Sequence, residues 1–198
     1  MSTPELILDV AQDMLQKGGL QAFSYRDISS RVGIRTASIH YYYPTKADLA
    51  HAIVTRVRKQ FSTALAEIDT GTSDPLRRLE KFCGIFLDTL GSADRLCPMC
   101  MLAMGQDEIP PAVRREVCEF WRHGEHWVAE NIEQVRAQGK YPPAVKSSQL
   151  AQNWMATLEG AMVAARAFNE RARLVDAIAV LLAGLAPVVS RRKNRLDR

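Results

Sequence analysis

The sequence predicts an all-α protein, and three observations support this. Nearly every apolar run follows the three-and-four spacing of an amphipathic helix. No segment shows the strict alternation of a half-buried β-strand, and no glycine-rich nucleotide loop or low-complexity tract interrupts the pattern. Glycines and prolines fall between the apolar runs, where they end one helix and precede the next. We therefore expect a chain of helices, with four of them inside the first 66 residues.

The first two predicted helices span residues 4–17 and 25–32. A stripe of apolar residues marks the inward face of the first helix, and a pair of glycines ends it. Ser24 followed by Asp27 resembles a capping box for the second helix, and Gly33 ends that helix. The second helix is consequently short.

A third short helix is predicted over residues 36 to 42 or 43, because Pro44 disfavours helical geometry in the residue before it. Thr45 and Asp48 form a second capping pair, which begins a longer helix predicted to run to about Ala66. Two short helices joined by a turn that contains a glycine form a helix-turn-helix arrangement, whose second helix can enter the major groove of DNA.

The remaining apolar runs predict a larger helical domain. Its expected helices span residues 75–90, 111–138, 147–169 and 172–190. The segment GKYPPAVKSS separates the second of these helices from the third. We divide the chain into a helix-turn-helix DNA-binding domain at 1–50, a helical domain at 51–190 and a basic tail at 191–198.

Composition and charge narrow the class of protein. The 198 residues are 47% hydrophobic, enough for one sizeable domain or two small ones that share a core. The longest uncharged apolar run, residues 177–190, is shorter than the roughly 20 residues of a membrane span, so we expect a cytoplasmic protein without membrane contact. Residues 1–59 carry a net charge of +3, residues 60–186 carry −3 and residues 187–198 carry +4. This asymmetry is compatible with chance, but it also suits an N-terminal unit that meets a polyanion.

Residues 34–46 read IRTASIHYYYPTK, and this concentration of phenols favours a nucleic-acid surface. Ile39 and Tyr43 lie four residues apart and face inward, so their neighbours point elsewhere. Phenol hydroxyls donate to phosphate oxygens, His40 could reach a base edge, and Lys46 lies in a first helical turn where amides and an ammonium can bind one phosphate. The alternative interpretation is that the tyrosines only seal a small three-helix core.

The segment GIRTASIHYYYPTKADL at 33–49, together with the preceding FSYRDISSRV, resembles the recognition-helix signature of the TetR family of bacterial one-component transcriptional regulators. The resemblance is specific over roughly residues 5–55 and weak beyond. It implies that Arg26, Thr36, Ala37 and His40 fall at base-reading places. It places Ser38, Tyr41, Tyr42, Thr45 and Lys46 at places that contact the DNA backbone. His40 stands where a tyrosine is usual and Ala37 where glycine or proline is frequent, which leaves the operator sequence open.

The resemblance also implies a C-terminal domain that binds a small-molecule inducer and forms a homodimer. We expect a repressor that binds a pseudo-palindromic operator and is released by a ligand or electrophile, and we expect no cofactor and no enzymatic activity. Small residues among apolar ones near the C-terminus allow close helix approach in a dimer seam, although these faces could instead be buried within their own chain. The predicted seam residues are Trp154, Leu158, Ala161, Met162, Ala165, Ile178, Leu182, Leu185 and Val189.

An apolar ligand site is predicted between the central helices, with His126 or Glu125 as a polar anchor. Aromatic and methionine stripes are also typical of plain core, so this alternative stays open. The candidate ligand-binding residues are Phe82, Phe86, Met99, Met104, Trp121, Trp127, Trp154 and Met155.

The motif CPMC at 97–100 has three interpretations: a redox pair, half of a zinc site, or two small apolar side chains in a core. Zinc would need Cys118 with His123 or His126, a spacing that matches no common closed site, so we predict no metal. An all-helical CxxC thiol enzyme is the alternative function. We expect Cys97 at a helix N-cap, where amides favour thiolate, with Cys100 placed to resolve a sulfenic acid on it.

Overall fold

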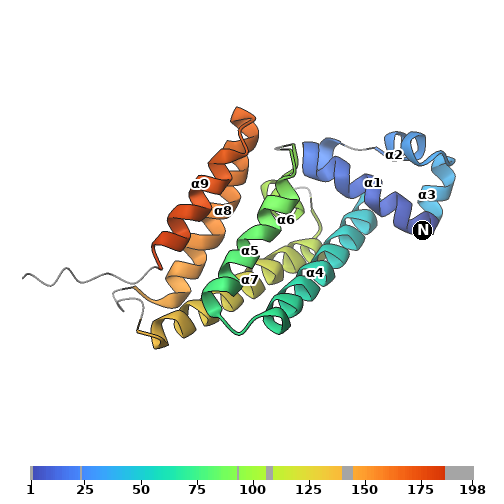
Figure 1. Cartoon of the computed structure of the whole chain (residues 1–198). Helices are drawn as coiled ribbons and strands as arrows, with labels where there is room; N and C mark the ends of the chain where they lie inside the picture. Colours follow the sequence, from blue (N-terminus) through green and yellow to red (C-terminus); the bar gives the residue numbers. More distant parts are fainter. Residues whose placement is uncertain (1, 23, 93, 106–108, 140–144, 186–198) are drawn as a thin grey trace, which may run out of the picture.

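The computed structural model describes residues 2–22, 24–92, 94–105, 109–139 and 145–185. All regular structure in these residues is helical, as the sequence predicts (Figure 1). The helices are α1 (Thr3–Gly18), the short 3-10 helix η1 (Leu20–Ala22), α2 (Tyr25–Val32), α3 (Thr36–Tyr42), α4 (Lys46–Gly71), α5 (Pro75–Leu90), α6 (Pro98–Met104), α7 (Pro111–Ala137), α8 (Ser147–Phe168) and α9 (Ala172–Ala183).

The short N-terminal helices pack around one small core. Ile7, Leu15, Ile28 and Ile39 are completely buried there, and Leu49 joins them from the first turn of α4. Burial of an aliphatic side chain of this size stabilises a fold by roughly 1.5–3 kcal/mol, so these side chains together hold α1, α2 and α3 against one another. In Figure 1, α1–α3 lie at one end of the molecule.

Capping side chains begin α2 and α4 at the positions that the sequence predicts. The Ser24 hydroxyl accepts a hydrogen bond from the Asp27 amide at 3.2 Å, and the Asp27 carboxylate accepts one from the Ser24 amide at 3.1 Å. Thr45 and Asp48 repeat this reciprocal box at the start of α4. Each pair satisfies backbone amides that a helix N-terminus otherwise leaves without partners.

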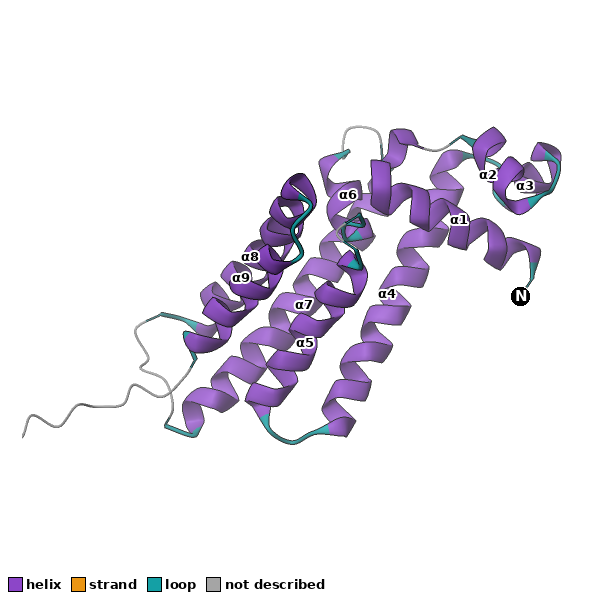
Figure 2. Cartoon of the chain, turned by 45° about the horizontal axis from the view of Figure 1, so that its top comes forward, coloured by secondary structure: helices purple, strands orange, loops and turns teal. Residues whose placement is uncertain are grey.

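Helix α4 joins the N-terminal helices to the rest of the molecule (Figures 1 and 2). It runs to Gly71, five residues beyond the predicted end at about Ala66. Residues 67–71 contain no proline, and Ile68 on this extra turn is buried, so packing continues the helix past the predicted end. Among the described residues, α4 thus extends from the helix-turn-helix to the far corner of the body.

The body is built on aromatic contacts between α4, α5 and α7. Phe82 of α5 is completely buried and stacks on Trp127 of α7, with ring centroids 5.4 Å apart. Phe61 of α4 packs against Phe120 of α7 at 4.5 Å. Such pairs contribute about 0.5–1.5 kcal/mol each beyond the area that they bury.

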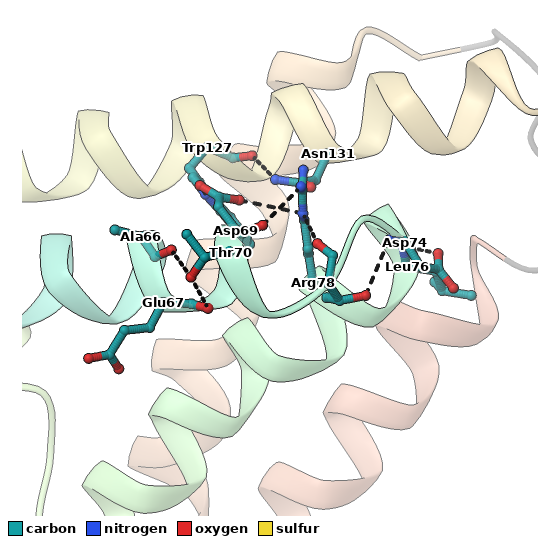
Figure 3. A network of polar contacts seen from close by, with 10 residues as sticks. Ala66, Glu67, Asp69, Thr70, Asp74, Leu76, Arg78, Trp127 and Asn131 are labelled. Carbon is teal, nitrogen blue, oxygen red and sulfur yellow. Dashed lines mark hydrogen bonds and ion pairs between the residues drawn. The ribbon is translucent and has the colours of Figure 1, made fainter.

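A polar network fixes the α4–α5 corner on α7 (Figure 3). The Asp69 carboxylate accepts a hydrogen bond from Trp127 Nε1 at 3.0 Å and forms an ion pair with Arg78 at 3.5 Å. Arg78 also donates to the Thr72 carbonyl at 2.8 Å, and the Asn131 amide donates to the Trp127 carbonyl at 2.9 Å. The network therefore joins the end of α4, the start of α5 and the middle of α7.

Helices α8 and α9 pack side by side on the edge of the body farthest from α2 and α3 (Figures 1 and 2). Gly124 permits the close approach of α8 to α7, because a Cβ there would lie 3.1 Å from Met155 Cε. Helix α9 ends at Ala183. The last predicted residues of that helix and the basic tail at 191–198 lie outside the described residues.

Candidate nucleic-acid interface and ligand cavity

The turn between α2 and α3 has the geometry of a helix-turn-helix. Gly33 adopts a left-handed conformation with φ of 76°, which favours glycine, and its amide donates to the Ser29 carbonyl at 2.9 Å. The Ile34 amide donates to the same carbonyl at 3.1 Å. The chain then enters α3 at Thr36, whose hydroxyl lies 3.2 Å from the Ser29 hydroxyl.

The inward side of α3 explains one of the three tyrosines. Ile39 is completely buried, and Tyr43 is half-buried with its hydroxyl donating to the Pro4 carbonyl at 3.3 Å. Tyr25 of α2 donates to the Tyr43 carbonyl at 2.7 Å. These contacts hold α3 against α1 and α2, so its other side keeps a fixed orientation.

The outward side of α3 presents the other two tyrosines. Tyr41 is 81% exposed and Tyr42 is 41% exposed, and their rings meet edge to face at 5.0 Å. Lys46 is exposed in the first turn of α4, directly after this face. Of the other predicted DNA-contacting residues, those that are exposed are Arg26, Ala37, His40 and Thr45, and those that are half-buried are Thr36 and Ser38.

His40 and Thr45, which are both predicted to contact DNA, also have partners within the chain. His40 Nδ1 lies 3.1 Å from the Pro44 carbonyl, and its ring packs against Tyr25 at 4.6 Å. If Nδ1 donates to that carbonyl, Nε2 is the ring nitrogen left to accept from a base. The Thr45 hydroxyl serves the α4 capping box, so Thr45 positions the start of α4.

A cavity of about 460 Å³ lies where α1, α4, α5 and α7 meet. Its wall combines aromatic side chains with amides, one guanidinium and one carboxyl group, which suits an amphipathic organic molecule. The residues that line it are Gln12, Gln16, Val57, Gln60, Phe61, Ala64, Ile85, Phe86, Asp88, Thr89, Arg95, Cys97, Pro98 and Phe120.

Of the eight predicted ligand-binding residues, only Phe86 lines this cavity. Met104 is 63% exposed on α6, and Trp121 lines a separate surface pocket together with Cys118 and Glu125. The exposed His126 forms an ion pair with Glu130 at 3.2 Å if it is protonated. The other five candidates are core side chains: Phe82, Met99, Trp127, Trp154 and Met155. In the part of the chain that the structure describes, no cluster of three or more His, Cys, Asp or Glu side chains suits a metal ion.

Residues far apart in the sequence line this cavity, which sequence spacing could not reveal. Gln12 and Gln16 come from α1, the first helix of the DNA-binding unit. Arg95 lines the cavity and donates to the Asp13 carboxylate of α1 at 2.9 Å. A molecule in the cavity would therefore contact α1 directly.

Two further contacts attach α1 to the body. The Leu96 amide donates to the Gln16 carbonyl at 3.0 Å. From α8, the Arg166 guanidinium donates to the Gln16 carbonyl at 3.4 Å and also to the Lys17 carbonyl. The C-terminal end of α1 is consequently held by the segment before α6 and by α8.

The structure places Cys97 at the N-cap of α6, but it corrects the expected thiolate. Burial, reinforced by the carboxyl of Glu159, raises the pKa of the Cys97 thiol well above its usual value. Burial also raises the pKa of the Cys100 thiol to about 12. The cost of burying a charge outweighs the favourable field of the helix terminus. Both residues are therefore thiols at neutral pH.

Most of the predicted dimer seam packs inside its own chain. Leu158, Met162 and Ala165 are completely buried, because α8 packs on α7 and α9. Trp154, Ile178 and Leu185 are also buried, Ala161 and Leu182 are half-buried, and Val189 lies outside the described residues. The exposed large apolar residues of α8 and α9 are instead Val163, Phe168, Val175 and Val180.

A helix-turn-helix with an exposed aromatic face, carried on a helical body, defines the class of helix-turn-helix transcription regulators. Residues 7–53 match the model of bacterial regulatory proteins of the tetR family, and residues 75–181 match the Tetracyclin repressor-like C-terminal domain. The chain therefore belongs to the TetR family of transcriptional regulators, which confirms the resemblance in the recognition helix.

Solved structures agree with this assignment. A TetR-family transcriptional regulator from Agrobacterium tumefaciens is 32% identical with a TM-score of 0.87, over 92% of this chain and 97% of that one. A TetR transcriptional regulator from Legionella pneumophila is 27% identical with a TM-score of 0.85, over 93% and 98% of the two chains. The regulatory protein TetR from Rhodobacter sphaeroides, at 18% identity and a TM-score of 0.83 over 92% and 98%, shares the fold. No curated protein matches the chain. None of the helices described here is long and apolar enough to cross a membrane.

Proposed function

We propose that the protein is a repressor that binds a pseudo-palindromic DNA operator as a homodimer and leaves it when a small molecule occupies the cavity. The observation that carries the proposal is the outward face of α3. Tyr41 and Tyr42 are exposed there beside Lys46, while Ile39 and Tyr43 fix the opposite side of the helix. Phosphate contacts from the phenols and the ammonium would position the helix, and His40 would read a base edge.

The second copy would pack on the exposed apolar residues of α8 and α9. Val163 and Phe168 of α8, with Val175 and Val180 of α9, lie on the pair of helices farthest from the helix-turn-helix. A two-fold arrangement through these helices would leave both α3 helices free to enter successive major grooves. Family membership supports this occupant, because dimerisation is general among TetR regulators.

Ligand release would follow from the position of the cavity. Gln12 and Gln16 of α1 form part of its wall, and Arg95 in the same wall pairs with Asp13. A ligand that prefers one arrangement of these groups would shift the orientation of α1, and with it the spacing of the two α3 helices.

Selection of bound fragments from a random DNA pool tests the proposal. We expect enrichment of a palindrome with half-site centres about one helical turn apart or somewhat more, and an affinity that falls steeply with salt. Lys46→Ala and Tyr42→Ala should weaken binding to specific and random DNA alike, whereas His40→Ala should change the preference among bases. A helical thiol enzyme would enrich no sequence, and that result would refute the proposal.

A further inference from the structure

One part of the cavity wall is aromatic and lies out of water. Phe61, Phe86 and Phe120 line the cavity, and each is between 3% and 5% exposed. The ring centroids of Phe61 and Phe120 lie 4.5 Å apart. The cavity volume of about 460 Å³ falls within the range of roughly 300–1,000 Å³ that is typical of small-molecule sites. This part of the wall suits the apolar group of an organic ligand.

The α1 side of the cavity carries a polar side chain without a partner. Gln16 is 8% exposed and lines the cavity, and its side-chain amide has no hydrogen-bond partner among the described residues. Burial of an amide without a hydrogen bond is unfavourable, so an apolar residue would serve packing better at this position. The amide is therefore suited to a molecule in the cavity that supplies the hydrogen bond.

The neighbouring Gln12 is oriented so that its N–H groups are left to donate. Arg56 donates to Gln12 Oε1 from Nε at 3.1 Å and from Nη2 at 2.5 Å. Because a guanidinium can only donate, the atom that it meets has to be the amide oxygen. Arg56 is itself held by the Asp9 carboxylate at 2.5 Å and by the Leu8 carbonyl at 2.9 Å. The Nε2 hydrogens of Gln12 are consequently the part of this side chain that can bind a ligand.

Arg95 adds a guanidinium to the same side of the wall. Its Nε donates to one Asp13 carboxylate oxygen at 2.9 Å, and its Nη2 lies 2.9 Å from the same oxygen. Asp13 also pairs with Lys17 at 3.1 Å and with Arg31 at 3.7 Å. Three cations therefore share Asp13, and the second carboxylate of this cluster, Asp94, pairs with Lys17 at 3.5 Å. The cluster keeps one positive charge that its own carboxylates do not balance.

An acidic residue in the wall, Asp88, has less influence on a ligand. It lines the cavity, but its side chain is exposed on α5. Water screens an exposed charge, so an ion pair with Asp88 would stabilise a complex little. Gln12 and Arg95 are half-buried and Gln16 is almost fully buried, so hydrogen bonds to them are stronger. The less exposed polar groups thus favour a ligand that accepts hydrogen bonds over a cation.

We propose that the cavity binds an organic anion in which an aryl or alkyl group carries one carboxylate. The apolar group packs among the three phenylalanine rings, and the carboxylate accepts hydrogen bonds from Gln12, Gln16 and Arg95. Charge-assisted bonds of this kind are about twice as strong as neutral ones. An effect of this anion on operator affinity rests on the proposed function, whereas binding of the anion does not.

The bound anion competes with Asp13 for Arg95. Their ion pair is one of the contacts that attach α1 to the body. The others are the hydrogen bonds that Leu96 and Arg166 donate to the Gln16 carbonyl. A guanidinium that is shared between two carboxylates holds each of them less firmly. The anion therefore loosens one attachment of α1 without touching the DNA-contacting face of α3.

Three probes with the same aromatic group and different polar groups test the ligand class: 2-naphthoate, 2-naphthamide and 2-naphthylmethylammonium. Isothermal titration calorimetry measures their affinities for the full-length protein at neutral pH without DNA. We expect 2-naphthoate to bind at least about tenfold more tightly than either of the others, because it alone brings a negative charge to the donors. Equal affinities, tighter binding of the ammonium compound, or no binding of any probe would overturn the proposal.

Substitutions of the donors locate the carboxylate. Arg95→Met keeps the apolar stem and removes the charge, so it should weaken binding of 2-naphthoate at least about tenfold and that of 2-naphthamide much less. Gln16→Met should weaken binding of both, because each probe carries a carbonyl or carboxylate oxygen. Arg77→Met, on the exposed side of α5, is the matched control and should change neither affinity. Asp88→Asn should not weaken binding of 2-naphthoate. Unchanged binding of 2-naphthoate by Arg95→Met that melts as a folded protein would overturn the proposal.

A substitution that fills the cavity shows whether the probes bind there. Ala64 lines the cavity and is half-buried, so Ala64→Phe places a ring in the space that the naphthyl group would occupy. Folded Ala64→Phe should bind 2-naphthoate at least about tenfold more weakly than the wild type. Wild-type affinity in this variant would place the bound anion outside the cavity and overturn the proposal.

Operator binding with and without 2-naphthoate separates this inference from the proposed function. A protein that binds 2-naphthoate as expected but selects no DNA sequence would overturn the proposed function and leave the ligand class standing. A protein that selects an operator but prefers the ammonium compound would overturn the ligand class alone. If both hold, 2-naphthoate should weaken operator binding by the wild type and not by Arg95→Met. An operator affinity that saturating 2-naphthoate leaves unchanged would overturn the competition for Arg95.

Discussion

Replacing Glu159 by Gln should stabilise the reduced protein more at high pH than at low pH. The pKa of Glu159 rises from an ordinary 4.5 to about 7 on folding, because burial disfavours the charged form. Between these values the folded protein holds the proton that the unfolded chain has lost, so the free energy of unfolding falls as the pH rises. Above pH 7 the cost levels off at about 3 kcal/mol, since one pKa unit corresponds to about 1.4 kcal/mol.

The size of the change with pH follows from the same two pKa values. About 1.4 kcal/mol of this cost is already present at pH 5.5, and nearly all of it at pH 8.5. The difference in unfolding free energy between Glu159→Gln and wild type should therefore grow by about 2 kcal/mol between these conditions.

Urea unfolding at pH 5.5 and 8.5 measures this difference, at fixed protein concentration and with a reducing agent present. Glu67→Gln on the exposed side of α4 is the control, and it should show the same small difference at both pH values. A difference for Glu159→Gln that does not change with pH would show that burial does not raise the pKa of the Glu159 carboxyl, and the reasoning would fail.

Three further outcomes are expected. Val180→Glu, on the α9 side chain that is 72% exposed, should convert dimers to monomers in sedimentation and weaken operator binding at least about tenfold, while Met104→Glu on α6 should do neither. Phe82→Ala should lower the unfolding free energy by about 3–5 kcal/mol in urea titration, because the ring is completely buried against Trp127. Arg166→Ala should speed hydrogen exchange at the end of α1 and leave α9 unchanged, because it removes bonds to two α1 carbonyls.

Helix positions could be predicted from local chemistry wherever a cap or breaker was present. Ser24 with Asp27 and Thr45 with Asp48 set two starts, and Gly33 set one end. The end of α4 was not predictable in this way, because its last turn depends on burial of Ile68. Local signals therefore set helix starts well, and tertiary packing decides ends that lack a breaker.

The same distinction between local signals and tertiary packing decides which parts of the candidate sites could be predicted. Outward residues of α3 followed from their spacing against Ile39, because only the short helix itself was involved. The cavity did not follow, since Gln12 and Gln16 are ordinary polar residues in sequence and line it only because α1 packs on α4 and α6. The burial of Glu159 did leave a signal in the sequence. It lies four residues after Met155 and three before Met162, so it shares the apolar face of its helix with them.

The anchored corner at Asp69 makes α4 a lever. Its 26 residues span about 39 Å, and the contacts of Asp69 with Trp127 and Arg78 provide a fulcrum at the far end. Phe61 in the cavity wall lies eight residues from Asp69, or about 12 Å, and Lys46 beside the DNA face lies 23 residues away, or about 35 Å. If α4 rotates as a rigid rod about this corner, a sideways displacement of about 1 Å at Phe61 becomes about 3 Å at Lys46. A small adjustment around a bound molecule is then enough to move a phosphate contact out of register.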